Sequence, residues 1–439
     1  MTRASQLKAG VARANITPPV GIQLCGFAGR GPSVGFGDNL YATALVLADG
    51  AARAAIVACD LIDLPLPFAE TVFAEAARRT RIPADNIVLC CSHTHYGPET
   101  RTFEGDATKS DLVAYMADLK FRLAGAIQEA NSNLHPVLAR VGRGTSDVGI
   151  NRRERRPDGT IILGRNPGGP IDREVIVLRL DRRNGDPLAC VLNFQAHAVS
   201  QTHRGRLISA DFPGPARDAV EQLTGATCMY IQGACGNINS EIMEVGLQSP
   251  RKLGRRLAAS AVAAYEKGEP VEVTPVRTAN ADIKLPAKTY ESVKQAREAV
   301  DGFEKQLAHA EAHKAHKGTL HWINLRLKRA RAALESLESG KPLPPVTGRM
   351  WAIRAGDFAL ATSPGEIFCE IGQAIKAGSP MPHTMFASCT NGGVGYVPMP
   401  ENYPEGGYEV DSACRVGPAA AGIVTDTGLR LLKRTKPSR

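Results

Sequence analysis

The chain of 439 residues contains no apolar run of the roughly 20 residues that a membrane-spanning helix needs. Residues 1–8 also lack the apolar segment of a secretory signal, so we expect a cytoplasmic protein without a transmembrane segment. None of its ten cysteines belongs to a C-x-x-C pair, and several lie in strand-like apolar runs, which favours reduced, buried thiols. These absences argue against membrane, secreted and disulfide-rich classes of protein.

Aromatic residues are also scarce, at 5% of the chain, which bears on its net charge of +9. A basic protein has to be considered as a nucleic-acid binder, which would show steep salt dependence. The basic clusters at 152–156, 252–256 and 326–331 are far apart and lack interleaved aromatic residues. We therefore interpret them as solvated faces and predict no nucleic-acid partner. The first cluster adjoins the site proposed below, where it would attract an acidic substrate or a product carboxylate.

Histidines follow directly on two strand-like apolar runs. Residues 87–91 lead into His93 and His95, whose side chains point the same way because they are two apart on extended backbone. A second run, 191–194, leads into His197. Neutral imidazole is the commonest biological metal ligand and also transfers protons near neutral pH. An isolated H-x-H is a purely structural pair about as often as it is a functional one. The other segments therefore decide between these two interpretations.

Two later segments extend the pattern with oxygen donors. Residues 358–361 lead into a turn that carries Glu366, and the glycine-rich loop 391–397 presents Tyr396. Glu366 alone could equally be a carboxylate at a helix N-terminus. Two imidazoles, a carboxylate and a phenolate make a plausible zinc set with a place left for water. Asp60 and Asp211 are candidates for orienting a ligating imidazole, with helix capping as the alternative for Asp211.

Six segments carry a resemblance to a known family. They are 92–98 (S-H-T-H-Y-G-P), 193–197 (N-F-Q-A-H), 207–214 (L-I-S-A-D-F-P-G), 232–237 (Q-G-A-C-G-N), 363–366 (S-P-G-E) and 395–397 (G-Y-V). In sequence and in order they resemble the motifs of the neutral/alkaline non-lysosomal ceramidases. The resemblance spans residues 8–410, nearly the whole chain.

The resemblance implies a zinc-dependent hydrolase that cleaves an amide bond by attack of a metal-bound water. The residues that it implies as Zn²⁺ ligands are His93, His197, Glu366 and Tyr396. His95 would act on the proton or the oxyanion, and Arg152 would neutralise the oxyanion. Such a zinc ion lowers the pKa of bound water toward ~7.

One departure from the family concerns the proposed nucleophile of its relatives. Where they carry G-D/N-x-S-P, this chain has G-N-I-N-S at 236–240, so Asn239 replaces the serine and Ser240 lies one place later. A shift of one residue turns a side chain to the opposite side of extended backbone. This favours attack by water, with Asn237 and Asn239 as hydrogen-bond donors to the substrate. Cys235 is a less favoured alternative nucleophile.

The substrate class is inferred from the same resemblance. The ceramidases carry a further β-sandwich domain, whereas this chain ends about forty residues past Tyr396. Together with the missing signal segment, this favours a small or amphipathic acylated amine over a sphingolipid. A zinc-dependent esterase or lactonase is the alternative enzyme, because the chemistry barely differs. A binding protein that keeps the fold without turnover is the alternative from another class.

Strand patterns alternate with helical patterns, which predicts an α/β fold of mixed sheets covered by helices in a single catalytic domain, 1–439. The strands expected are 40–47, 54–59, 175–180 and 188–194, and the helices are 68–79, 112–130 and one starting near Pro213.

Residues 288–340 differ, because their apolar residues step by three and four. This predicts an inserted helical hairpin that serves as a lid or as the arm of a homo-oligomer. His309, His313 and His316 have a spacing that could bind metal, although a solvated polar face is the preferred interpretation.

Overall fold

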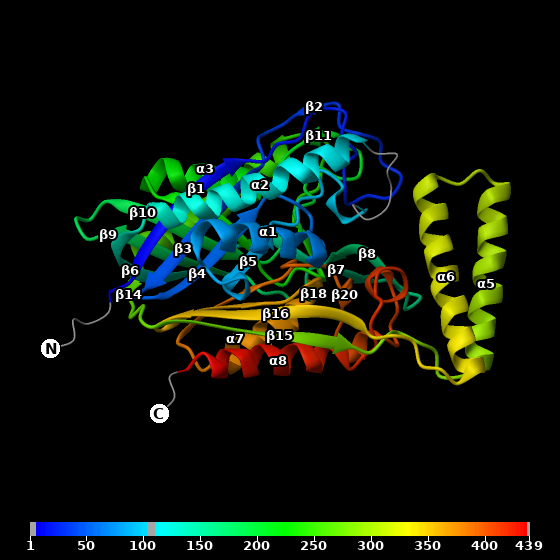
Figure 1. Cartoon of the computed structure of the whole chain (residues 1–439). Helices are drawn as coiled ribbons and strands as arrows, with labels where there is room; N and C mark the ends of the chain where they lie inside the picture. Colours follow the sequence, from blue (N-terminus) through cyan, green and yellow to red (C-terminus); the bar gives the residue numbers. More distant parts are fainter. Residues whose placement is uncertain (1–5, 103–109, 437–439) are drawn as a thin grey trace.

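The computed structural model describes residues 6–102 and 110–436. Two sheets pack face to face, and helices cover their outer faces, so the body is layered as helix, sheet, sheet and helix (Figure 1). A pair of helices projects beside the body, and the first strand and the last helix, at the two ends of the described chain, begin and end on the opposite side (Figure 1). The predicted α/β class with mixed sheets is confirmed. Among the described residues, no helix combines the length and apolar character required to cross a membrane.

The larger sheet mixes antiparallel and parallel pairs. Its order is β12 (Thr227–Gln232), β10 (Pro187–Phe194), β9 (Glu174–Arg182), β6 (His135–Thr145), β1 (Lys8–Asn15), β3 (Tyr41–Asp49), β4 (Ala52–Cys59) and β5 (Ile87–Cys91), with β14 (Glu269–Pro270) beside β6. Both ends of this order are parallel pairs, β10 with β12 and β4 with β5. The strands predicted at 40–47, 54–59, 175–180 and 188–194 are confirmed as β3, β4, β9 and β10.

Helices cover the outer face of this sheet. They are α1 (Leu66–Thr80), α2 (Ser110–Ser132), α3 (Pro213–Thr224) and α4 (Gln248–Glu266), of which the first three were predicted. Strand β9 shows why both faces are apolar: Val175 and Val177 pack in the cluster with α4, whereas Ile176 and Leu178 join the core between the sheets. Alternating side chains on a strand face opposite sides, so a sheet covered on both sides needs apolar residues at every position.

The second sheet has the order β15 (Val276–Leu285), β16 (Val346–Ala355), β17 (Phe358–Thr362) and β19 (His383–Ala387). Its outer face is covered by α7 (Cys369–Gly378) and α8 (Ala420–Arg434). Smaller sheets are β2 (Gly35–Phe36) with β11 (Leu207–Ile208), β13 (Ile238–Ser240) with β7 (Gly149–Arg155) and β8 (Ile161–Asn166), and β18 (Glu366–Ile367) with β20 (Tyr396–Val397). Short helical turns are η1 (Ala84–Asn86), η2 (Thr100–Thr102), η3 (Pro400–Asn402) and the π-type turn η4 (Tyr408–Ser412).

The segment that follows β19 joins the two sheets and both edges of the larger one. The amide of Cys91, at the end of β5, donates to the carbonyl of Cys389, and the amide of Ser388 donates to the carbonyl of Gln232, at the end of β12. Strands β5 and β12 also contact each other, although they are opposite edges in the pairing order. The carboxyl ends of β5, β10 and β12, far apart in sequence, therefore meet in one place.

The predicted helical hairpin is confirmed as α5 (Val293–Ala312) and α6 (Lys317–Ser339). It has a small apolar core of its own, formed by Val300, Leu327 and Ala330. Helix α6 faces the body, where it contacts η4 (Figure 1). The three hairpin histidines are exposed, in keeping with the preferred interpretation of a solvated polar face: the rings of His309 and His313 lie 4.1 Å apart, and His316 caps α6 by accepting from the amide of Gly318.

Candidate functional site

Three histidine side chains meet where β5 and β10 end. His93 and His95 follow β5, and His197 follows β10, as the sequence predicted. A bridge between Thr94 and Ala198 holds the two loops side by side. One ring nitrogen from each of the three imidazoles lies within 4.8 Å of the others. This is a spacing at which a single cation can bind all three side chains.

Backbone carbonyls orient two of the imidazoles. Nδ1 of His93 lies 2.9 Å from the carbonyl oxygen of Ile62, and Nδ1 of His197 lies 2.7 Å from that of Cys235 and 3.1 Å from that of Ile238. A carbonyl oxygen only accepts hydrogen bonds, so Nδ1 carries the proton in both rings. The Nε2 atoms are left to present their lone pairs to the centre of the cluster.

Glu366 and Tyr396 are brought to this centre by the parallel pairing of β18 with β20, in which they are direct partners. Oε2 of Glu366 lies 2.8 Å from Nε2 of His197 and 3.4 Å from Nε2 of His93. The hydroxyl of Tyr396 lies 3.3 Å from Nε2 of His197. All four predicted ligands thus lie together, and the structure adds the nitrogens of His95 to the group.

The charges in this group require a positive partner. Burial alone would raise the pKa of Glu366, but His93 and His197 hold it well below its usual range. A carboxylate and an imidazole lone pair 2.8 Å apart are both acceptors, so a proton or a cation has to lie between them. With a proton there, the pKa of His197 is about 9, because Cys235 and Glu366 raise it against the effect of burial. A divalent cation is the other occupant that satisfies both atoms.

His95 differs from the other two histidines in its surroundings. Both of its ring nitrogens are buried without a hydrogen-bond partner among the described residues. Burial, together with the nearby His93 and His197, lowers the pKa of His95 well below its usual range. Its ring packs edge-on against Phe27, with centroids 5.1 Å apart. A neutral imidazole with an unused lone pair and an unused N–H can accept and return a proton.

Arg152 lies on β7 beside the cluster, as the resemblance implied. Its Nη1 donates to Oδ1 of Asn239 at 3.1 Å and lies 3.4 Å from Nε2 of His197. Its Nη2 is buried and has no partner among the described residues. Because buried polar atoms are normally paired, this unused donor indicates a place for a negatively charged oxygen.

Glu409, in η4, holds this guanidinium and was not predicted from the sequence. Its Oε1 accepts from Nε of Arg152 at 2.7 Å, and its Oε2 accepts from Nη1 of Arg153 at 3.0 Å. The side chain is buried, with 1% exposed. Burial alone would lower the pKa of Arg152, but Tyr396 and Glu409 raise it above its usual value, so the charge is retained. No motif pointed to Glu409, since its contacts come from the fold.

Asp60 and Asp211 lie away from the imidazole contacts expected of them. Oδ2 of Asp60 accepts from Nη1 of Arg217 at 2.7 Å, and Asp211 accepts from the hydroxyl of Ser200 at 2.7 Å and from the amide of Phe212 at 2.7 Å. The imidazoles use backbone carbonyls instead. Burial raises the pKa of Asp211 to about 7. Helix capping, the alternative considered above, is wrong as well: the N-cap of α3 is Phe212, whose side chain makes no capping hydrogen bond.

The loop with the two asparagines divides its side chains between the site and the scaffold. Asn239 contacts Arg152, whereas Asn237 accepts from the amide of Cys369 and donates to Glu370, so it supports the start of α7. Ser240 donates from its hydroxyl to the carbonyl of His197 at 2.8 Å. This hydroxyl is committed to the backbone.

The backbone at the site is in an unusual conformation. His93, Cys389 and Asn391 have φ angles of 60°, 52° and 53°, in the left-handed region that residues other than glycine seldom adopt. Such strain persists only where the surrounding structure imposes it, and it concentrates at functional sites. Each of these residues adjoins the contacts between β5 and the segment after β19.

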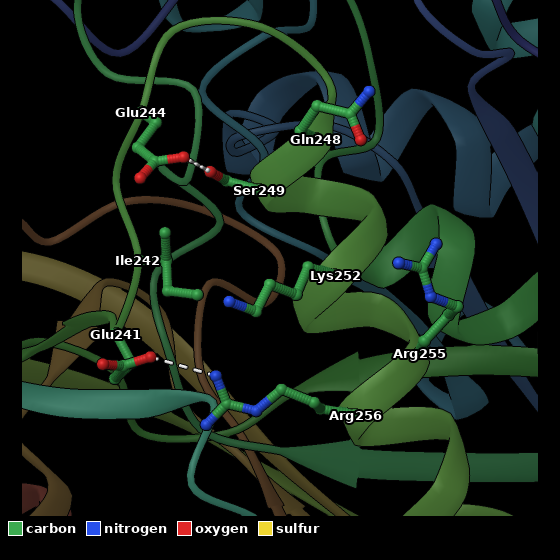
Figure 2. A pocket seen from close by; sticks show the side chains of 8 residues that line it. All are labelled: Glu241, Ile242, Glu244, Gln248, Ser249, Lys252, Arg255 and Arg256. Carbon is green, nitrogen blue, oxygen red and sulfur yellow. Dashed lines mark hydrogen bonds and ion pairs between the residues drawn. The ribbon is translucent and has the colours of Figure 1, made fainter.

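A separate surface pocket of about 430 Å³ lies between the loop after β13 and the start of α4 (Figure 2). Figure 2 shows two interactions within its lining, Arg256 bonded to Glu241 and Ser249 bonded to Glu244. None of the histidines lines this pocket, so the histidine cluster is the better candidate for chemistry.

The donor set fits a metal ion. Two nitrogen lone pairs and a carboxylate oxygen face one another, and Nε2 of His93 has no hydrogen-bond partner among the described residues. Imidazoles with one carboxylate suit zinc, and a fixed Nδ1–H contact behind each ligand is the usual arrangement of such sites.

Comparisons with known proteins bear on the family and on the fold of this chain. A family model described as neutral/alkaline non-lysosomal ceramidase, N-terminal, matches residues 7–275. A crystal structure of neutral ceramidase from Pseudomonas aeruginosa superposes with a TM-score of 0.72 at 19% identity, covering 99% of this chain and 76% of that one. A structure described as ceramidase complexed with C2 gives 0.75 at 19% identity, covering 99% and 77%. At this identity, the structural matches bear on the fold.

Proposed function

Because the chain belongs to the neutral/alkaline non-lysosomal ceramidase family, we propose that it is a zinc-dependent hydrolase of an N-acylated amine. The observation that carries this proposal is the pair of acceptors, Nε2 of His197 and Oε2 of Glu366, held 2.8 Å apart inside a group of three imidazoles. A bound zinc ion would polarise the amide carbonyl and lower the pKa of water toward ~7. His93, His197, Glu366 and Tyr396 would hold it.

His95 is the proposed proton carrier. Its nitrogens are buried and unpaired, and its low pKa keeps the ring neutral, so one nitrogen can take the proton of the attacking water. The same proton then goes to the amine nitrogen as the carbon–nitrogen bond breaks, which gives a free amine and a carboxylic acid. A positioned acid–base group of this kind contributes typically 10²–10⁴-fold.

Arg152 is the proposed stabiliser of the tetrahedral oxyanion. Glu409 and Asn239 fix its Nε and Nη1, which leaves Nη2 to donate to a developing negative charge. Tyr396 is instead the proposed fourth metal ligand, because its hydroxyl lies 3.3 Å from Nε2 of His197. Ser240 takes no part in this scheme because its hydroxyl is bonded to the backbone.

The first experiment measures metal content and hydrolysis together. Elemental mass spectrometry on the wild-type protein is expected to give near-stoichiometric zinc, and the double variant His93→Ala/His197→Ala is expected to lose it. The matched control is His309→Ala/His313→Ala, which removes two histidines from the hairpin and should leave the zinc content unchanged.

Hydrolysis is then tested on N-acyl amines and on the corresponding esters. Preference for the amide series, abolished by the double variant at the cluster, would support the proposal. Ester hydrolysis alone would replace the amidase by the esterase alternative. Protein without metal that gains neither metal nor activity when zinc is added would contradict the proposed function.

A further inference from the structure

The projecting hairpin reaches the site through a row of aromatic rings. The ring of Trp322, on α6, lies edge-on to that of Tyr408, with centroids 5.5 Å apart. Tyr408 lies 5.8 Å from Tyr396, which is stacked parallel to His197 at 6.3 Å. The row therefore leads outward from a proposed metal ligand to the second turn of α6.

A second contact joins the start of α6 to the loop that covers His95. At Gly29, a Cβ atom would lie 2.7 Å from the ring of His316 and 2.8 Å from the amide of Gly318, so only glycine fits there. Two residues earlier, Phe27 packs against the ring of His95. The first turns of α6 are thus seated against the loop on one side and against η4 on the other.

The outer end of this arrangement is a set of three partly exposed rings, Phe27, Trp322 and Tyr408, which we call the aromatic rim. Trp322 has no part in the hairpin core of Val300, Leu327 and Ala330, and its indole makes no hydrogen bond within the described part of the chain. Large aromatic rings gain most when an apolar partner covers them. The rim therefore offers apolar surface that is not needed to stabilise the hairpin.

We propose that the aromatic rim binds the hydrocarbon chain of the substrate's acyl group, and that Trp322 sets the preference for long chains. This inference rests on the proposed function. In an N-acylated amine whose carbonyl lies at the histidine cluster, the acyl chain starts at that carbonyl carbon and therefore begins beside the inner end of the row. The row runs from Tyr396, which is buried beside the cluster, to Tyr408 and Trp322, whose partly exposed rings offer that chain apolar surface. Each methylene buried on it should raise kcat/KM about fourfold.

Binding is tested by tryptophan fluorescence, because the chain has two tryptophans in unlike settings. Trp351 is buried, with 1% exposed, and its Nε1 donates to the carbonyl of Asp85, so Trp322 is the one that a ligand can reach. Dodecanoate below its micelle threshold is expected to shift the emission of the wild-type protein, whereas hexanoate should not. Trp322→Phe, which retains Trp351, should show no shift. An unchanged emission in the wild type, or a shift that persists in Trp322→Phe, would overturn the proposal.

Selectivity is tested with amides of acetate, hexanoate and dodecanoate. In Trp322→Ala, the ratio of kcat/KM for the dodecanoyl over the acetyl amide should fall about tenfold. Leu334→Ala is the matched control: Leu334 lies on the same helix, packs against the hairpin core and should keep the wild-type ratio. Equal ratios in the wild type and Trp322→Ala would overturn the role of Trp322. If the wild type cleaves no amide, the proposed function fails. The fluorescence experiment still tests whether the aromatic rim binds a hydrocarbon chain.

Discussion

The histidine cluster and the α5–α6 hairpin are two regions built by opposite means. The cluster draws its side chains from β5, β10, β18 and β20, and it holds buried nitrogens without partners and backbone in the left-handed region. The hairpin is two regular helices from one continuous segment, with a core of its own. The comparison teaches that the reactive geometry depends on distant segments held under strain, whereas the hairpin depends mainly on local periodicity.

The largest effect should come from removing one ligand of the cluster. His93→Ala is expected to lower kcat/KM by about a thousandfold or more, because it removes metal that supplies several kcal/mol of transition-state stabilisation. His309→Ala, on the hairpin, should stay near wild type. Steady-state kinetics with parallel metal analysis checks both. Equal activity of the two variants would contradict the proposal that the histidine cluster, and not the hairpin, carries the catalytic residues.

The next effect separates the histidines within the cluster. His95→Gln is expected to lower kcat by about 10²–10⁴-fold while the zinc content stays the same, because His95 is proposed to move a proton rather than to hold metal. The measurement is kcat together with elemental analysis of the same sample. Loss of zinc in His95→Gln would make His95 a third imidazole ligand, which the spacing of the three imidazoles also permits.

A smaller effect is expected at Glu409, which touches Arg152 but not the proposed ligands. Glu409→Gln should lower kcat by roughly 10–100-fold, since residues that orient a reacting group commonly have effects of this size. Its KM should change less. The control is Glu405→Gln, because Glu405 pairs with Arg153 at 31% exposure and should leave kcat near wild type. A matching loss in both variants would point to a structural role of the whole loop.

The smallest effect on activity should come from the hairpin core. Leu327→Ala removes a buried side chain, which commonly costs about 2 kcal/mol or more. Amide hydrogen exchange should show the loss as faster exchange confined to α5 and α6, with kcat for an acetyl amide near wild type. A large fall in kcat would show that the order of the hairpin and that of the cluster are coupled.

The sequence predicted the hairpin more completely than the histidine cluster. The spacing of apolar residues was enough for the hairpin, because a helix records its buried face every three or four residues. The motifs indicated His93, His95, His197, Glu366 and Tyr396, and the structure brings these five together. The motifs did not indicate which groups orient the imidazoles. The carboxylates expected in that role, Asp60 and Asp211, form hydrogen bonds elsewhere.

Glu409 was missed for a related reason. It adjoins Tyr408 in a π-type turn, and its two arginine partners are more than 250 residues earlier in the chain. A buried charge pair of this kind leaves no periodic signal, since the spacing along the chain is arbitrary. The contact of β5 and β12 with the segment after β19 is equally non-local.

The carbonyl contacts behind His93 and His197 also bear on how the site tolerates change over generations. The atoms that fix these rings belong to the main chain of Ile62, Cys235 and Ile238, and every amino acid supplies the same oxygen there. Substitution at those three positions leaves the acceptor in place as long as the backbone path is kept. The two rings are therefore held by backbone atoms that amino-acid substitution does not remove. A search for invariant side chains would overlook these contacts.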